Sequence, residues 1–319
     1  MAVNGYGDLS AYGWGRALLE DEGAGFGDEV SEDALPRYID PLNDWGFKRL
    51  FGTEMNKEFL VAFLMTIFPD KRIKDITYLP TEQLGMAAGD RNARFDVMCR
   101  DESGEKFIIE VQLAYQKHFR ERALYYSGMA LHSQGVKGKR WNYNIKGVYF
   151  VGLQNFDFGP ERGGGLIRRY SVRDDKNGDL MTDKLRFVFI EIERFDKGPD
   201  ELKTNLDKWF YVLKNLHILL ERPAALVDRI FSRFFEAAEV ISLTKDEKQQ
   251  YVSNMINERD TYNQIAYARE FGREEGLEQG KIAEREAIAL RLVEANTPMD
   301  IIVKCTGLDK AAVEALAQQ

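Results

Sequence analysis

One short block of the chain constrains its fold more than any other. Two apolar runs, residues 93–100 (ARFDVMCR) and 107–113 (FIIEVQL), flank a polar turn centred on Ser103. Apolar runs on either side of a short Gly-containing turn predict a β-hairpin. Each run is interrupted by one acid, Asp96 in the first and Glu110 in the second. A turn centred on Ser103 places these two acids opposite each other, on the same face of the sheet.

This pair of carboxylates needs an explanation, because like charges about 5 Å apart repel strongly when both are ionised. A divalent cation between them would remove the repulsion and give the pair a function. Gln112 lies two residues beyond Glu110 and therefore projects from the same face. One interpretation places these side chains on an edge strand that faces water. The apolar neighbours in residues 107–111 favour the other, a strand buried on both faces, where an unpaired carboxylate is costly.

Helices and strands alternate around the hairpin. Interleaved elements of this kind predict an α/β fold with one mixed core sheet flanked by helices. From apolar periodicity and composition, helices are expected over 43–52, 56–68, 116–132 and 201–220, and further strands over 76–79, 146–155 and 185–193.

Charge and glycine content divide the chain into three segments. Residues 1–36 are rich in Gly, and up to residue 35 eight acids face the single base Arg16, a net charge of −7. Such a stretch buries too little apolar surface to offset its ordering entropy, which predicts a disordered tail. A folded domain is predicted over 37–223 and a helical C-terminal region over 224–319. The whole chain carries −8, so the part outside the tail is close to neutral.

Several classes of protein are excluded by what the chain lacks. The two cysteines lie far apart and the three histidines have no metal-binding spacing, which argues against a disulfide scaffold and a Cys- or His-based metal centre. No run of about 18 apolar residues predicts a membrane span, and no signal peptide is recognised. We therefore expect a cytoplasmic protein without membrane contact, in which any metal ion would have oxygen ligands, as Mg²⁺ prefers.

The C-terminal segment has two features that each allow two interpretations. Gly272, Gly276 and Gly280 recur every four residues in a charged helical context. They form either a smooth stripe that another helix can approach closely or a frayed, partly helical linker, since each helical Gly costs about 1 kcal/mol relative to Ala. Residues 300–317 predict a helix, a turn and a helix. This is the start of a helix-turn-helix or, as we prefer, an αα-hairpin cap.

The acids and their surroundings resemble a known family. The hairpin is similar to the core of the PD-(D/E)XK nuclease superfamily, in which an Asp on one strand and a Glu on the next hold the catalytic metal. The triplet Glu110-Val111-Gln112 resembles the E-x-Q motif of one branch, the PD-(D/E)XK family transposases or recombination-promoting nucleases (Rpn). The segments 44–52 (DWGFKRLFG) and 122–127 (RALYYS) and the residue Trp209 resemble further motifs of that branch. The resemblance covers residues 38–220 and implies a restriction-endonuclease-like core.

The resemblance also implies roles for individual residues. Asp96 and Glu110 would be catalytic metal ligands for Mg²⁺ or Mn²⁺, together with the backbone carbonyl of Val111. Gln112 would be the third catalytic residue, in the position where the superfamily usually has Lys. Because an amide carries no charge, Gln112 would only orient water or phosphate. The missing positive charge would come from Arg122 or Lys117, Glu82 is a further candidate acid, and Asp44 and Lys48 are interpreted as securing the first helix.

Positive charge gathers directly after the acidic hairpin. Between residues 117 and 146 seven bases face one acid, a net charge of +6, and four Tyr or Trp residues lie among them. Bases for phosphates and aromatic rings for stacking are what a nucleic-acid groove needs. A solvated helix and loop is the alternative interpretation. The residues predicted to contact nucleic acid are Lys117, Arg120, Arg122, Tyr126, Lys139 and Arg140.

Taken together, these features predict a magnesium-dependent DNA endonuclease that hydrolyses phosphodiester bonds, and the family association suggests recombination or phage defence. An alternative is a nuclease-like fold that cuts weakly or not at all and acts as a DNA- or protein-binding module. The C-terminal helices would serve in a homo-oligomer. The acidic tail would either occlude the basic groove or, as the simpler interpretation, keep the chain in solution.

Overall fold

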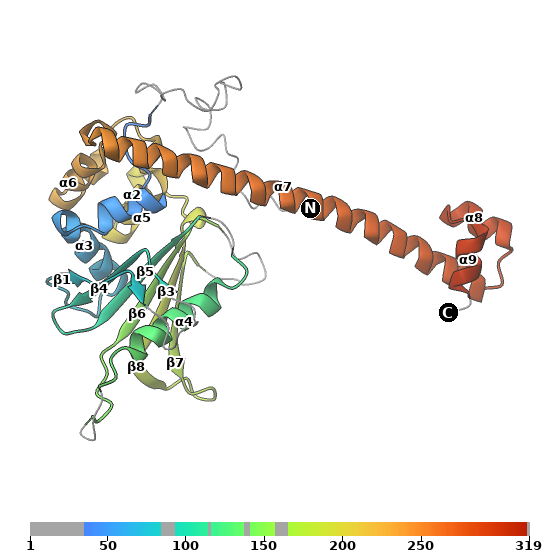
Figure 1. Ribbon diagram of the computed structural model, residues 1–319, viewed down its shortest axis with the longest axis horizontal. Coiled ribbons are helices and arrows are strands. Elements are labelled where there is room, and N and C mark those ends of the chain that lie inside the picture. Colours follow the sequence, from blue (N-terminus) through green and yellow to red (C-terminus); the bar gives the residue numbers. More distant parts are fainter. Residues whose placement is uncertain (1–34, 84–92, 114–115, 137–140, 157–164, 318–319) are drawn as a thin grey trace. The chain divides into compact units, whose positions relative to one another are not determined.

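The computed structural model describes residues 35–83, 93–113, 116–136, 141–156 and 165–317 (Figure 1). The predicted tail up to residue 34 and the predicted nucleic-acid contacts Lys139 and Arg140 lie outside these residues. The chain forms two compact units, one through Met255 and one from Ile256, which are described separately. The predicted division at residues 36 and 223 stays a prediction.

A mixed six-stranded sheet is the centre of the first unit. Its strands lie in the order β1-β4-β5-β6-β8-β7. The pairs β5–β6 and β6–β8 are parallel, and the other three pairs are antiparallel. The strands are β1 (Ile76–Tyr78), β4 (Val97–Asp101), β5 (Lys106–Gln112), β6 (Val148–Gln154), β7 (Ile167–Arg173) and β8 (Leu180–Glu191). A separate two-stranded sheet pairs β2 (Glu82–Gln83) with β3 (Ala93–Arg94).

The hairpin of β4 and β5 has the predicted register. Val97 pairs with Ile109 and Arg100 pairs with Lys106, so position 96 falls opposite position 110 and the turn is centred on Ser103. Asp96 itself lies in a bend directly before β4 rather than inside the strand. Because β5 lies between β4 and β6, the interpretation of the acids as water-facing edge residues is wrong for Glu110, which is buried.

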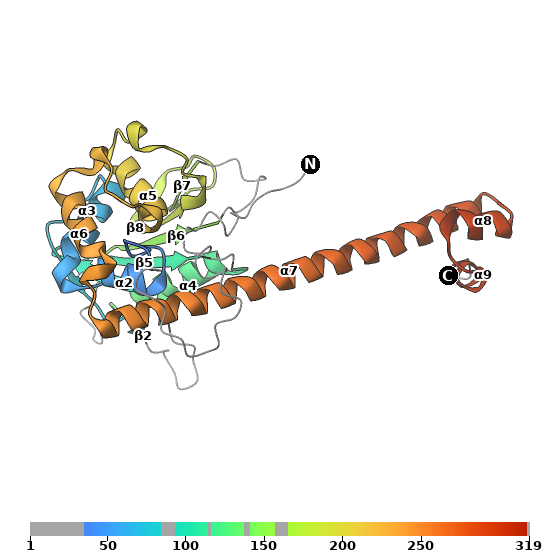
Figure 2. The same ribbon diagram turned by 90° about the horizontal axis from the view of Figure 1, so that it is seen from above.

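Helices cover both faces of the sheet and create two cores. One face packs against α4, and its core includes Met98, Ile108, Phe150 and Phe189. The opposite face packs against α2, α3, α5 and α6 in the larger core, around Trp209. From above, α4 and α5 lie on opposite sides of the strands (Figure 2). The helices are α2 (Asp44–Phe51), α3 (Lys57–Ile67), α4 (Phe119–His132), α5 (Asn205–Asn215) and α6 (Arg229–Ala238), with single 3₁₀ turns at Glu54–Asn56, Ile192–Arg194, Pro199–Glu201, Leu216–Ile218, Ala224–Leu226 and Val240–Ser242.

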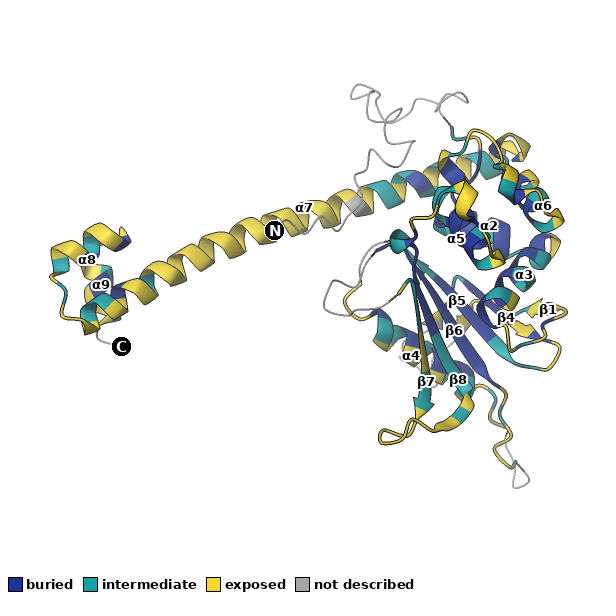
Figure 3. Ribbon diagram, turned by 180° about the vertical axis from the view of Figure 1, so that it is seen from behind, coloured by how far each residue is buried: buried dark blue, intermediate teal, exposed yellow. Residues whose placement is uncertain are grey.

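The burial pattern confirms the predicted α/β core. Every residue of β6 is buried, and β5 is buried over most of its length, so both strands are largely dark blue in Figure 3. A strand covered on both faces explains why these segments are almost continuously apolar in sequence. The polar residues that interrupt them therefore stand out as candidates for function.

Local signals in the sequence fix the position of α2. The Asn43 side chain caps the helix by accepting a hydrogen bond from the Gly46 backbone N–H at 3.1 Å. A Cβ at Gly46 would lie 2.1 Å from the Asp40 carbonyl oxygen, so only glycine allows this close approach. The Phe51 ring lies 4.9 Å from that of Phe47 and 5.8 Å from Trp209. These contacts hold α2 against the core and fix which of its side chains face the sheet.

Two strands, β7 and β2, were not predicted. Strand β7 forms the edge next to β8, and its sequence IRRYSVR has only two partly buried apolar residues at its ends plus exposed Arg and Tyr. An edge strand with one solvated face is too polar to be found by composition. Strand β2 has two residues and is too short for any periodicity, whereas β3 lies within the predicted run 93–100 and ends before Asp96. The predicted helix over 201–220 is shorter in the structure, where α5 is flanked by 3₁₀ turns.

The second unit is entirely helical in the residues described. Helix α7 (Lys245–Glu294) crosses the boundary between the units and continues without interruption through Gly272, Gly276 and Gly280, so the interpretation as a frayed linker is wrong. Helices α8 (Met299–Thr306) and α9 (Lys310–Leu316) follow. Gly307 joins them in the left-handed conformation, with φ 69°. Ala289, Ile302 and Val313 form a small core between α7, α8 and α9, as expected for an αα-hairpin cap.

Candidate active site

The carboxyl groups of Asp96 and Glu110 meet at the point where β5 approaches its end. Two backbone hydrogen bonds lock them reciprocally. The Asp96 N–H donates to Oε1 of Glu110 at 3.3 Å, and the Val111 N–H donates to Oδ2 of Asp96 at 2.7 Å. The hairpin register therefore holds one oxygen of each carboxylate and leaves the other oxygen of each for a further partner. The two acids come together as predicted.

Burial makes it costly for both acids to be ionised at once. Glu110 is only 4% exposed, and burial, followed by the nearby charge of Asp96, raises the pKa of Glu110 to about 8. The pKa of Asp96 is likewise raised to about 6, mainly by burial and to a smaller extent by the nearby Asp44 carboxylate. Arg122 and Lys48 lower the pKa of Glu110 without cancelling the effect of burial. Paired titratable groups with raised pKa values are a common property of active sites.

Arg122 reaches the acid pair from α4. Its Nη2 lies 3.5 Å from Oε2 of Glu110 and donates to Oε1 of Gln112 at 2.8 Å. Its Nη1 donates to Oε1 of Gln116, and the guanidinium lies 5.1 Å from the centre of the Phe119 ring. Gln112 therefore faces the site as predicted, but its carbonyl oxygen already accepts from Arg122. Lys117, the other predicted source of charge, lies exposed in the turn before α4 rather than in the helix.

A second cation reaches the pair from α2. Nζ of Lys48 lies 2.6 Å from Oδ1 of Asp44 and 3.9 Å from Oδ1 of Asp96. The interpretation that Asp44 and Lys48 only secure the first helix is therefore incomplete, because both reach the acid pair electrostatically. The signal in the sequence was their spacing of four residues, which places both on one face of α2.

The donor set fits a hard divalent cation. The largely buried carboxylates of Asp96 and Glu110 offer oxygen ligands, which Mg²⁺ prefers together with several water molecules, and the Val111 carbonyl would be a third. Asp96 has a side chain 20% exposed, so the pair is open to solvent on its side. Within the described part of the chain, no group of three or more His, Cys, Asp and Glu side chains forms a metal site. Glu82, the further candidate acid, lies in the separate two-stranded sheet, opposite Arg94 in register.

The predicted nucleic-acid residues take different positions around α4. The Arg120 guanidinium lies 5.7 Å from the centre of the Tyr170 ring, on the unpredicted strand β7. Tyr126 packs its ring edge-to-face on Phe95 at 5.1 Å and is half-buried. The basic segment is therefore partly folded into the core around α4 rather than wholly solvated.

A polar row that the sequence analysis missed continues from Gln112 across the sheet. Gln112 pairs in register with Gln154 of β6, and Gln154 pairs with Glu191 of β8. Glu191 is fully buried and accepts hydrogen bonds from Arg168 at 2.5 Å and Arg194 at 2.7 Å. The Gln154 amide is also fully buried, and no hydrogen-bond partner for it is found among the described residues. Only the parallel pairing of β5, β6 and β8 brings these side chains level.

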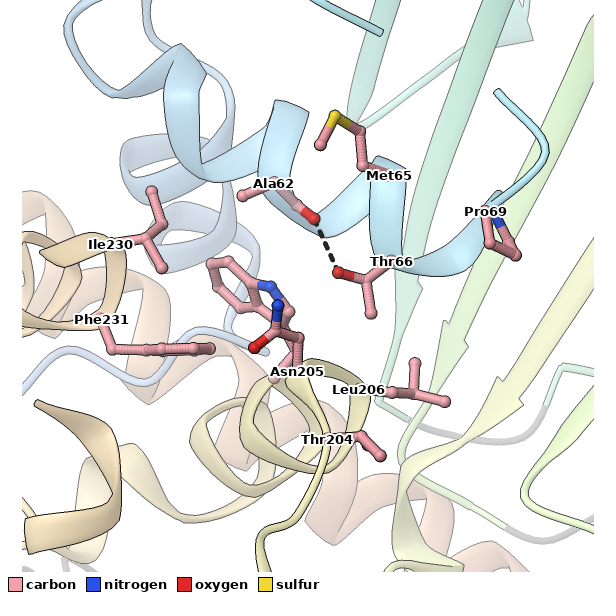
Figure 4. A pocket seen from close by; sticks show the side chains of 10 residues that line it. Ala62, Met65, Thr66, Pro69, Thr204, Asn205, Leu206, Ile230 and Phe231 are labelled. Carbon is pink, nitrogen blue, oxygen red and sulfur yellow. Dashed lines mark hydrogen bonds between the residues drawn. The ribbon is translucent and has the colours of Figure 1, made fainter. Parts of the chain in front are cut away.

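A cavity on the described surface lies elsewhere. It has a volume of about 360 Å³ between α3, α5 and α6, and its lining includes Met65, Leu206 and Phe231 (Figure 4). None of the predicted site residues lines it. This cavity is therefore separate from the acid pair.

Comparison with known proteins places the chain in a family. The model of the family described as PD-(D/E)XK nuclease family transposase matches residues 41–268, which is more than half of the chain. No curated protein and no solved structure matches the chain. None of the helices in the described residues is long and apolar enough to cross a membrane.

Proposed function

Because the chain belongs to the PD-(D/E)XK nuclease family transposases, with the restriction-endonuclease-like core expected of them, we propose that it is a metal-dependent DNA endonuclease. The single observation that carries this proposal is the pair Asp96 and Glu110, two carboxylates locked together by backbone hydrogen bonds in a largely buried position. Such a pair is unfavourable when empty and ionised, and favourable when it holds a divalent cation.

In this proposal the residues divide the work of phosphodiester hydrolysis. Asp96, Glu110 and the Val111 carbonyl would hold Mg²⁺ or Mn²⁺. When bound, the ion would lower the pKa of a coordinated water and polarise the scissile phosphate. The water oxygen bonds to phosphorus and the bond from phosphorus to the leaving oxygen breaks. The water's proton passes to solvent, and the leaving oxygen takes one up.

The side chains around the acids orient these reactants. Arg122 fixes the Gln112 amide and partly balances the charge of Glu110, because its Nη2 contacts both. Gln112 has an amide N–H₂ with which to orient water or phosphate. Lys117, Arg120 and Tyr126 lie on or before α4 and would guide the backbone of DNA towards the acids, as would Lys139 and Arg140.

Cleavage of supercoiled plasmid with magnesium tests this function. We expect wild-type protein to nick or linearise the plasmid, and Asp96→Ala and Glu110→Ala to lose activity by at least about 10³-fold. The matched control is Glu105→Ala, which removes a carboxylate at the other end of β5. Equal cutting by the wild type and both site variants would contradict the assignment.

One observation favours a second candidate, a nuclease-like fold that binds DNA or protein without cutting. Position 112 holds an uncharged amide, and its oxygen is bound by Arg122. Titration with Mg²⁺ in a calorimeter separates the two candidates. Binding that is lost in Asp96→Ala favours the nuclease, and no binding in the wild type favours the binding module.

Further properties belong to the same proposal. The exposed glycine stripe of α7 supports a homo-oligomer formed through the C-terminal helices, since a Cβ at Gly272, Gly276 or Gly280 would meet no described atom within 4 Å. Sedimentation of the chain truncated after Ala224 tests this, because an unchanged oligomer would exclude these helices. The cytoplasmic location, the role in recombination or phage defence and the membership of the Rpn branch stay predictions.

A further inference from the structure

The cation nearest to Asp96 comes from a helix far away in the sequence. Lys48 lies one turn into α2, and its Nζ is 3.9 Å from Oδ1 of Asp96. Oδ1 is the oxygen left over when Oδ2 accepts from the Val111 N–H. Arg122 takes the equivalent place beside Oε2 of Glu110. The acid pair is thus bracketed by one cation on each side.

The two cationic side chains differ in how many contacts they make with the rest of the protein. Arg122 contacts Glu110, Gln112 and Gln116 and stacks against Phe119. A guanidinium held by this many partners keeps little capacity for a substrate. Lys48 contacts Asp44 and Asp96, and its side chain is 43% exposed. An ammonium group has three donors that rotate freely, so Lys48 can meet a phosphate without leaving its carboxylates.

The position of Lys48 is also well defined. Asp44 lies four residues before it on the same helix face, which is the favourable order for an acid and a lysine. The helix beneath them is held by the Phe47 and Phe51 rings in the core. Gly52 comes directly after the last residue of α2. A Cβ at Gly52 would lie 2.7 Å from the Lys48 carbonyl oxygen and 3.3 Å from the Val97 side chain. This end of α2 therefore rests against the first residue of β4, next to Asp96.

We propose that Lys48 is a catalytic residue that supplies, from α2, the positive charge that position 112 lacks. Lys48 contacts a non-bridging oxygen of the scissile phosphate and stabilises the negative charge that develops there as water attacks. It transfers no proton. Asp44 is a positioning residue that holds the ammonium beside the acids. This inference rests on the proposed nuclease function, and it assigns the cation that the function requires.

The test compares Lys48→Met and Lys48→Arg with a matched control, Lys57→Met. Lys57 begins α3, is 37% exposed and pairs with Glu54 and Asp75, so it resembles Lys48 in exposure and in having two acidic partners, but it does not contact the acid pair. With Mg²⁺ and plasmid, Lys48→Met should cut about 10²- to 10³-fold more slowly, as expected for the loss of one charge-stabilising donor. Lys48→Arg should retain part of the rate, and Lys57→Met should stay within about twofold of the wild type.

A second readout does not depend on cleavage. Binding of a short DNA duplex is measured with Ca²⁺ over a range of salt concentrations. The loss of one phosphate contact lowers the slope of log K against log salt by about 0.9. Lys48→Met should show this decrease, whereas Lys48→Arg and Lys57→Met should keep the slope. Asp44→Asn should lower kcat and keep the slope, because the charge of Lys48 remains.

The outcomes separate this inference from the function on which it rests. If the wild type cuts plasmid and Lys48→Met has the same cleavage rate and the same salt slope, the role of Lys48 is overturned and the nuclease function stands. The role of Lys48 is also overturned if Lys48→Met cuts more slowly, keeps the salt slope and binds Mg²⁺ proportionally more weakly. Lys48 would then act only through the acid pair. If the wild type binds duplex without cutting, the proposed function fails while the slopes still decide the phosphate contact. If it does not bind duplex at all, both fail.

Discussion

The two ends of strand β5 hold buried and partly buried ionisable groups in opposite arrangements. Before the strand begins, Glu105 accepts hydrogen bonds from Lys71 and Tyr149 at 2.8 Å each, and Lys71 donates to the Tyr149 hydroxyl at 2.6 Å. Towards its other end, Glu110 faces a second carboxylate, and the nearest cations lie 3.5 and 3.9 Å from the pair. We name these the balanced cluster (Lys71, Glu105 and Tyr149) and the acid pair (Asp96 and Glu110).

The balanced cluster has the arrangement expected of a group that stabilises the fold, and the acid pair has the arrangement expected of a functional site. In the balanced cluster a charge is buried together with its counter-charge, which a fold tolerates without any ligand. In the acid pair the fold buries two like charges and leaves them only partly compensated. Two partly compensated like charges do not stabilise the sheet. The acid pair is therefore where a bound cation is expected.

The largest expected effect is on cleavage. Asp96→Asn and Glu110→Gln keep side-chain size and remove one charge, so both should lower the rate of plasmid cleavage by about 10³-fold or more, because the cation loses a ligand. Glu105→Gln in the balanced cluster should leave the rate within about threefold. Comparable losses in all three variants would show that the two ends of β5 do not differ in function.

The balanced cluster should instead dominate stability. Lys71→Met leaves Glu105 and the Tyr149 hydroxyl without their ammonium partner, which should lower the free energy of unfolding by about 1–3 kcal/mol. Urea denaturation measures this change, and Lys48→Met is the comparison at the acid pair, where we expect a loss of less than about 1 kcal/mol. A greater loss for Lys48 than for Lys71 would reverse the distinction.

The acid pair should make stability depend on pH. Because the folded protein raises the pKa of Asp96 to about 6 and that of Glu110 to about 8, it holds protons more tightly than the unfolded chain does. The free energy of unfolding should therefore fall as the pH rises from about 4 to about 8 in metal-free protein. The neighbours Asp44, Lys48 and Arg122 modify this range.

Magnesium should oppose the fall, because it replaces the protons at the acids and binds only the folded state. Thermal melting at pH 5 and pH 8, with and without Mg²⁺, checks both statements, and we expect the increase in Tm on adding Mg²⁺ to be greater at pH 8. Glu110→Gln should flatten the pH dependence and reduce this increase. An equal effect of Mg²⁺ at both pH values would argue against a cation at the pair.

The smallest expected effect lies in the polar row beside the site. Gln154→Met keeps the side-chain length and removes a buried amide for which no partner is found among the described residues. The variant should be more stable by about 1 kcal/mol, measured by urea denaturation. Gln112→Met, in which the amide bound by Arg122 is lost, should not be stabilised. A destabilised Gln154→Met would show that the amide is satisfied in solution.

Much of the site could be predicted because it depends on short-range regularities. Side chains alternate with a period of two along a strand, so a turn centred on Ser103 is enough to set Asp96 against Glu110 and to put Gln112 on the same face. The cap at Asn43 and the glycine at position 46 are equally local. The same reasoning found strands β5 and β6, since strands buried on both faces are continuously apolar.

The partners of the acids could not be predicted in this way. Lys48 and Arg122 belong to elements on opposite faces of the sheet. The sequence allowed either Lys117 or Arg122 as the positive charge near the acids, and only the structure places Lys117 in the turn before α4. The row of Gln112, Gln154 and Glu191 exists because β5, β6 and β8 pair in parallel. Strand β7 takes the edge position through its pairing with β8. Which distant side chains meet depends on how the aromatic core seats α2, and on the order of strands in the sheet. Local periodicity sets the face on which each side chain lies, and long-range packing alone sets what lies opposite.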